Sequence, residues 1–455
     1  MNRTEYLESL TEQIRNKYAK ELVRTEICAH IEDQKEAYLL EGKEEEEAEN
    51  MAVREMGNPV DTGIQLDKIH RPKTDIWMLG TMAALSLIGI IMQSIICSNS
   101  GNTIISDHYP VRTIRFNLIG LCVMLFVYFA DYRILGKHIR GIYGIYLICS
   151  MVLLHVPIYP AYSSYLTLGQ TVCFLFVPLF AAICYHFRGE RGKGILKAIG
   201  ILFFHMLFLL FAGYYISAAM FLTFMACLLT LSGAAFKGIF GGRRKLQTGI
   251  LLSFIVGLPA LLIGDVMLFN GRFLSLAEYQ IRRIQVILSP FGHEDAISYQ
   301  TLLIRKQLAG ASLLGGGNIG EIGEISGAWS DYVLICLTSY FGLLIGIAVV
   351  AAISAFLVRS LHISFTQNNR LGFLLGISCS SILILKTVIY IAMNFGAGPI
   401  VGIDMPFLTY GLNCTVMNFL FMGIILSVYR NTNLLSELKN MPPRYRLKLE
   451  KTNEH

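Results

Sequence analysis

Residues 76–97, "IWMLGTMAALSLIGIIMQSIIC", form an uninterrupted run without a charged side chain. An α-helix rises about 1.5 Å per residue, so about 20 such residues cross the ~30 Å hydrocarbon core of a bilayer. Comparable runs recur through most of the 455 residues, of which 54% are hydrophobic and only 15% charged, and the mean hydropathy is +0.53. The sequence therefore predicts an all-α, polytopic membrane protein.

The apolar runs predict about ten transmembrane helices, at 76–97, 115–130, 141–157, 171–187, 194–212, 214–235, 247–269, 331–358, 372–395 and 405–429. The loops between them divide by charge: 131–140, 187–194, 237–245 and 359–370 are basic, whereas 158–170 and 396–404 contain neither Lys nor Arg. Basic loops stay on the cytoplasmic side of a membrane. We therefore expect a multi-pass protein of the cytoplasmic membrane with both termini in the cytoplasm.

The first 72 residues differ from the remainder in charge. They hold 17 acidic and ten basic residues, a net charge of −7, whereas the remainder carries +13. This asymmetry predicts an acidic cytoplasmic helical domain at 1–72, a membrane domain at 73–435 and a basic tail at 436–455. Residue periodicity predicts three helices in the acidic domain, with Gly42 ending the second and Gly57 ending the third.

The stretch "EEAENMAVREMGNPVDTGIQLDKIHRP", residues 46–72, resembles the small cytoplasmic helical domains of the HAAS type. Those domains are fused to various bacterial membrane proteins, and the resemblance implies a docking or signalling role. It therefore implies a cytoplasmic regulatory partner for residues 1–72. The Glu44–Glu47 run reads most simply as a solvated surface and a first helical turn that suits the helix dipole.

One loop on the predicted outer side is unusually long, at 270–330. It contains a basic amphipathic stretch, "AEYQIRRIQVIL", of the kind that receives an anionic lipid headgroup at a membrane interface. The glycine-rich "AGASLLGGGNIG" that follows matches no phosphate-binding fingerprint and is interpreted as a flexible connection. The excess of basic residues after residue 72 lies in short loops between apolar runs, which indicates membrane topology rather than nucleic-acid binding.

Three sequence blocks lie at and after this loop: "YQIRRIQVILSP" at 279–290, "SDYVLICLTSYFGLLIG" at 330–346 and "GPIVGIDMPFLTYGLN" at 398–413. With ten spans and a long outer loop after the seventh, they resemble the SEDS family (shape, elongation, division and sporulation), which includes FtsW, RodA and SpoVE. Those bacterial proteins polymerise lipid II into peptidoglycan strands. The resemblance covers roughly residues 76–430. It implies peptidoglycan glycosyltransferase activity at the outer face of the membrane, with a class B penicillin-binding protein as partner.

The resemblance also assigns roles to residues. Asp331 matches the proposed catalytic carboxylate of the family, a general base that deprotonates the acceptor 4-hydroxyl. Arg283 matches the family's arginine, and a diphosphate leaving group requires cations nearby. Lys386 is a charge within an apolar span, which marks a candidate functional position, paired with either Asp265 or Asp404. The full set of expected substrate-binding residues is Tyr279, Arg282, Arg283, Lys386, Thr409 and Tyr410.

Two readings of Asp331 remain open from the residues alone. A carboxylate half-buried at the edge of a membrane is desolvated, which makes it a better base near neutral pH. Alternatively, Asp331 caps the N-terminus of the eighth transmembrane helix, a position that Asp favours. The resemblance favours the catalytic reading.

Several positions depart from the family pattern. Ser339 and Tyr340 stand where the family has two glutamates, and Asp404 stands where it has a proline. Two other functional classes therefore remain: a non-catalytic scaffold or regulator of cell-wall synthesis, and a flippase for lipid-linked precursors. The ten cysteines are scattered and form no metal-type spacing with histidine. No cofactor is indicated, and the requirement for a divalent cation (Mg²⁺ or Mn²⁺) stays open.

Overall fold

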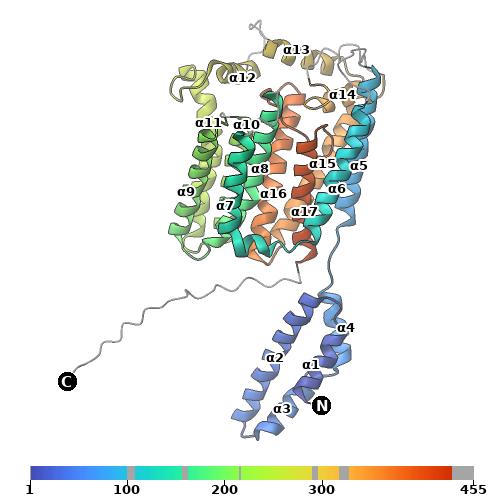
Figure 1. The fold of residues 1–455 in the computed structure, drawn as a ribbon, viewed down its shortest axis with the longest axis vertical. Helices are drawn as coiled ribbons and strands as arrows, with labels where there is room; N and C mark the ends of the chain where they lie inside the picture. Colours follow the sequence, from blue (N-terminus) through green and yellow to red (C-terminus); the bar gives the residue numbers. More distant parts are fainter. Residues whose placement is uncertain are drawn as a thin grey trace, which may run out of the picture. The chain divides into compact units, whose positions relative to one another are not determined.

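The computed structural model describes residues 2–99, 108–155, 162–214, 217–288, 296–316 and 327–432. Within these ranges it contains seventeen helices and no strand, which confirms the predicted all-α class (Figure 1). The chain divides into two compact units, one up to Arg71 and the other at Pro72–Thr432. The predicted basic tail at 436–455 lies outside the described residues.

The N-terminal unit contains four helices, α1 (Arg3–Glu12), α2 (Lys17–Leu40), α3 (Glu45–Glu55) and α4 (Pro59–Ile69). The prediction of three helices was therefore wrong, because "PVDTGIQLDKI" forms a fourth helix. Its start follows standard capping: the Asn58 side chain accepts a hydrogen bond from the Val60 N–H, and Pro59 takes the first helical position. Glu45–Glu47 form the acidic first turn of α3, as the sequence indicated.

The membrane unit begins with α5 (Ile76–Asn99), α6 (Tyr109–Phe129), α7 (Arg133–His155), α8 (Tyr162–His186), α9 (Gly192–Phe211), α10 (Ala218–Phe236) and α11 (Arg244–Phe269). Two short helices, α12 (Glu278–Leu288) and α13 (Ala296–Ala309), lie across one end of the bundle, at the end where α14 lies (Figure 1). The remaining helices are α14 (Val333–Phe341), α15 (Leu343–Phe365), α16 (Arg370–Asn394) and α17 (Leu412–Arg430).

Ten of these helices are long and apolar enough to span a membrane, namely α5–α11 and α15–α17, which confirms the predicted number. Helices α8, α10, α16 and α17 are the most buried, whereas α6 and α11 expose most of their side chains. The centre of the bundle is therefore built from α8, α10, α16 and α17. Polar side chains on their inner faces must find partners inside the protein.

The eighth span differs from its predicted range of 331–358. The segment is broken at Gly342, which has a φ of +98° and separates the short α14 from the spanning helix α15. A side chain at Gly342 would lie 2.7 Å from the Leu313 carbonyl oxygen, because residues 312–315 pass directly over the break. The Leu343 N–H donates to the Ser312 carbonyl at 2.9 Å. The apolar run is therefore continuous in sequence but broken in structure, and residues 312–315 contact the break.

Candidate functional site

Asp331 lies in a tight turn, Gly327–Tyr332, that precedes α14. The Gly327 carbonyl accepts hydrogen bonds from the N–H groups of Ser330 at 3.0 Å and Asp331 at 2.9 Å. Two spans hold this turn from its sides. Gln93 of α5 donates to the Trp329 carbonyl at 2.7 Å, and Asn394 of α16 donates to the Asp331 carbonyl at 2.9 Å. Main-chain contacts therefore fix the backbone of Asp331 and leave its carboxylate available.

The carboxylate of Asp331 does not cap a helix. The N-cap residue of α14 is Tyr332, which makes no side-chain capping hydrogen bond, and the spanning helix α15 begins only at Leu343. The N-cap reading of Asp331 was therefore wrong. Burial raises the pKa of Asp331 to about 6; a hydrogen bond with Ser330 opposes this rise, and the negative charge of Asp404 adds to it. Such a carboxyl is a stronger base than an exposed aspartate and is still mostly ionised at pH 7.

Most of the third sequence block lies in a loop, residues 395–411, between α16 and α17. Arg305 of α13 donates to the Gly396 carbonyl from Nε at 3.0 Å and from Nη2 at 2.7 Å. Gln170 of α8 donates to the Gly402 carbonyl at 2.7 Å. A Cβ atom at Gly402 would lie 3.9 Å from the Asp331 carboxylate, so the loop passes directly beside the candidate base.

Lys386 is fully buried on α16 and binds the same loop. Its ammonium lies 2.7 Å from the Asp404 carboxylate and 3.0 Å from Oδ1 of Asn418 on α17. Of the two partners that the sequence left open for Lys386, the structure selects Asp404. Asp265 instead accepts hydrogen bonds from the N–H groups of Phe273 and Leu274, at 3.0 and 3.1 Å.

The two other predicted residues of this loop have structural contacts. Thr409 is buried and donates its hydroxyl to the Met405 carbonyl at 3.1 Å. The ring of Tyr410 packs against Tyr109 of α6, with ring centroids 4.6 Å apart. These contacts place Thr409 inside the loop and Tyr410 at its edge, and their substrate-binding roles remain predictions.

The predicted residues of α12 divide between two environments. Tyr279 is exposed, and Arg282 forms an ion pair with Glu278 one turn earlier, at 2.9 Å. The Arg283 guanidinium lies 5.7 Å from the centre of the Tyr279 ring, and its Nε is buried without a hydrogen-bond partner among the described residues. Burial and the charge of Asp331 raise the pKa of Tyr332, whereas the positive charge of Arg283 lowers it. Of the two arginines of α12, Arg283 therefore acts electrostatically on the residue next to Asp331.

Four amide side chains of this site were not predicted. All four lie on spanning helices. Three bind main-chain carbonyls of the two loops at Asp331, namely Gln93, Gln170 and Asn394. Asn418 binds Asp404 of the Lys386–Asp404 ion pair. The available signal was their position, because a polar side chain inside an apolar span requires a partner within the protein.

Among the described residues, no group of three or more His, Cys, Asp or Glu side chains could hold a metal ion. The negative charge of Asp404 acts on Asp331, but the Asp404 carboxylate is already paired with Lys386. The requirement for a divalent cation therefore stays a prediction without a ligand set.

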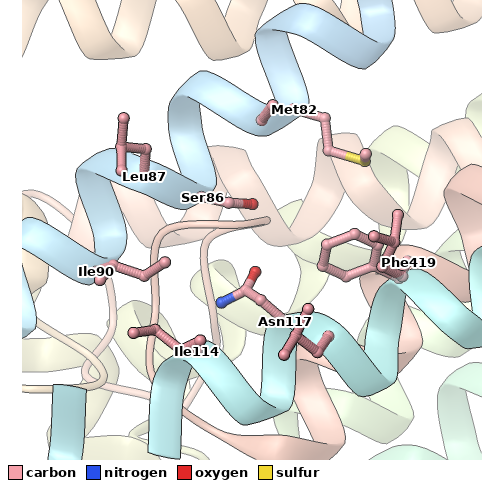
Figure 2. Close-up of a pocket in the computed structure, with 10 residues that line it drawn as sticks. Met82, Ser86, Leu87, Ile90, Ile114, Asn117 and Phe419 are labelled. Carbon is pink, nitrogen blue, oxygen red and sulfur yellow. The ribbon is translucent and has the colours of Figure 1, made fainter. Parts of the chain in front are cut away.

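A pocket of about 300 Å³ lies elsewhere in the membrane unit, between α5 and α6, with Phe419 of α17 beside it (Figure 2). The Asn117 carboxamide extends from α6 into the space between the two helices, on the side of Ser86 (Figure 2). The other lining residues are apolar and none is titratable. This pocket suits a hydrocarbon chain and carries no group for acid–base chemistry.

The fold and the site define a ten-span helical membrane protein with a half-buried carboxylate between two constrained loops. Residues 73–434 match the model of the FtsW/RodA/SpoVE family, described as cell cycle protein, and the chain belongs to this family. The resemblance seen in the three sequence blocks is thereby confirmed.

Individual relatives are distant. The chain is 28% identical to a probable peptidoglycan glycosyltransferase FtsW of Borreliella burgdorferi over 35% of its own length and 44% of that protein. It is 22% identical to the peptidoglycan glycosyltransferase MrdB of Escherichia coli over 42% of its length and 54% of that protein. The chain thus matches about half the length of these curated relatives.

Solved structures share the fold over a longer stretch. A chain of a peptidoglycan synthase complex, described as coordinating polymerization and crosslinking, superposes with a TM-score of 0.59 at 17% identity, over 79% of this chain and 98% of that one. The rod shape determining protein RodA of Thermus thermophilus gives 0.50 at 14% identity, over 79% of this chain and 97% of that one. These similarities establish the fold of the membrane unit.

Proposed function

We propose that this protein is a peptidoglycan glycosyltransferase that polymerises lipid II into glycan strands at the outer face of the cytoplasmic membrane. The observation that carries the proposal is Asp331: a half-buried carboxylate with a pKa raised to about 6, fixed through its backbone, that caps no helix. Relatives named as peptidoglycan glycosyltransferases support it.

The proposed reaction is an inverting glycosyl transfer. Asp331 accepts the proton of the acceptor 4-hydroxyl as that oxygen attacks the anomeric carbon of the donor. The bond from the anomeric carbon to the diphosphate breaks with its electron pair, so undecaprenyl diphosphate departs as an anion. Arg283 supplies positive charge on that side, since its guanidinium lies on α12 and acts electrostatically on Tyr332 beside Asp331.

The orientation follows from loop charge, with both termini in the cytoplasm and the 270–330 loop outside. We propose a class B penicillin-binding protein as partner, in keeping with the synthase complex that shares the fold. The acidic N-terminal unit is proposed as a separable docking domain for a cytoplasmic regulator.

The test is polymerisation of fluorescent lipid II by the purified full-length chain in liposomes, with and without the transpeptidase. We expect glycan strands from the wild type and almost none from Asp331→Asn. Asp61→Asn, which removes an exposed acid of the N-terminal unit, serves as the matched control and retains activity. A wild type that makes no strands with every partner supplied would overturn the enzyme assignment in favour of the scaffold.

A further inference from the structure

The buried cluster of Lys386, Asp404 and Asn418 joins three elements, because Lys386 belongs to α16, Asp404 to the 395–411 loop and Asn418 to α17. The Lys386 ammonium contacts both other side chains, and Asn418 donates from Nδ2 to Asp404 at 2.7 Å. The ring of Phe174 on α8 covers the ammonium, with its centre 5.0 Å away. Both charged groups of the cluster are therefore paired, Lys386 with no exposure and Asp404 with 12% of its side chain exposed.

Stability alone does not account for such a cluster. Desolvating two charges offsets most of their attraction, so a buried ion pair is often no more stabilising than apolar side chains of similar volume. The location of this pair is more informative. Asp404 follows Gly402 by two residues in one loop, and Gly402 lies beside the Asp331 carboxylate.

We propose that Lys386 and Asn418 are positioning residues that act through Asp404. They hold the 395–411 loop so that Gly402 borders the Asp331 carboxylate and a second carboxylate lies within electrostatic range of the first. The proposal rests on the proposed function, in which Asp331 is the base.

The charges around Asp331 define the consequence. Asp404 acts on Asp331 from the 395–411 loop, Tyr332 and Ser330 flank it in its own turn, and Tyr390 of α16 donates to the Ser330 carbonyl at 3.4 Å. Arg283 acts from α12 on Tyr332. Asp404 strengthens Asp331 as a base, while Lys386 offsets part of the charge of Asp404. Without that offset, two neighbouring carboxylates would compete for one proton.

The experiment follows the protonation of Asp331 itself, by infrared titration of the full-length protein in nanodiscs. The band of the protonated carboxyl is assigned to Asp331 by its absence in Asp331→Asn. In Asp404→Asn the titration midpoint of Asp331 is expected to fall by roughly half a pH unit, because a neighbouring negative charge is removed. The amide oxygen introduced by that substitution still accepts a hydrogen bond from Lys386, so the loop keeps its anchor.

A double variant, Lys386→Met with Asp404→Leu, replaces the whole pair by apolar side chains. It is included because a single substitution leaves one buried charge without its partner. The Asp331 midpoint is also expected to fall, by less than in Asp404→Asn, because the Lys386 cation is removed together with the Asp404 anion. Asp265→Asn is the matched control, since it removes a buried carboxylate that binds a different loop, and its midpoint stays unchanged. An unchanged midpoint in both Asp404 variants would overturn the proposal.

Turnover distinguishes this proposal from the proposed function. If Asp331 is the base, the acidic limb of the kcat/KM profile moves to lower pH together with the infrared midpoint. If the midpoint moves but the wild type polymerises no lipid II, the electrostatic coupling stands and the enzyme assignment fails. If the wild type is active and neither measure moves, the proposal is overturned while the enzyme assignment stands.

Discussion

The substitution Asp331→Asn separates chemistry from stability, because the two are expected to change in opposite directions. Removal of a general base typically lowers the rate by about 10²–10⁴, which corresponds to about 3–5 kcal/mol of transition-state stabilisation. The backbone contact that fixes this position survives, since Asn394 donates to the main-chain carbonyl of residue 331. We therefore expect a folded protein with almost no polymerase activity.

The stability change follows from the pKa of the same group. Its ordinary value of 3.8 rises to about 6 in the folded protein, so the folded state binds a proton more tightly than the unfolded state. Wild-type stability therefore falls as the pH rises from about 4 to about 6, by at most about 3 kcal/mol at about 1.4 kcal/mol per pH unit. An asparagine side chain at this position carries no such cost, so the variant is expected to be at least as stable as the wild type at pH 7.

The assay pairs polymerisation of lipid II with thermal unfolding of the same preparation, each measured between pH 5 and pH 8. The wild-type rate should decline below about pH 6, as Asp331 becomes protonated. Two results would refute the reasoning. One is near wild-type polymerisation by Asp331→Asn, and the other is loss of stability in the variant at pH 7, which would indicate a structural carboxylate.

Further outcomes test the other assignments. Arg283→Ala should lower turnover by removing charge beside the diphosphate, whereas Arg282→Ala should cost less because its partner is Glu278; equal losses would contradict the assignment to Arg283. A reporter in the 270–330 loop should label from outside and one at 237–245 from the cytoplasm, and reversed labelling would reject the topology. Deletion of residues 1–70 should leave the membrane unit folded but change its localisation, whereas failure to insert would make the N-terminal unit part of the core. Gentle detergent extraction from native cells should co-purify a single-span transpeptidase, and recovery of the monomer alone would count against that partner.

The sequence predicted the number of spans because the length and hydropathy of an apolar run are enough to indicate a transmembrane helix, whatever the rest of the chain contains. It failed where a boundary depends on distant residues. The break at Gly342 is completed by residues 312–315, which no local pattern reveals. Helix α4 was missed because the turn at Gly57 was interpreted only as the end of the preceding helix, although Asn58 and Pro59 marked the start of a new one. Hydropathy thus located the helices, whereas junctions between helices required contacts across the fold.

The site shows the same division. Asp331 and Lys386 could be identified as charges that are costly in an apolar setting, but their neighbours could not be assigned. The structure shows why: Gln93 and Asn394 bind main-chain carbonyls of the 327–332 turn, and Gln170 binds one in the 395–411 loop. An amide inside a span gives no indication of which carbonyl, often far away in the sequence, it will meet.

These amides also bear on the choice between an enzyme and a scaffold. A scaffold needs loops of defined shape, and backbone hydrogen bonds from Gln93, Gln170 and Asn394 are sufficient to provide that shape. It does not need a carboxylate whose burial raises its pKa to about 6, because such a group destabilises the fold at neutral pH. Strongly perturbed pKa values of this kind are characteristic of functional sites. Asp331 therefore favours catalysis over scaffolding, and Asp331→Asn is the change that separates the two.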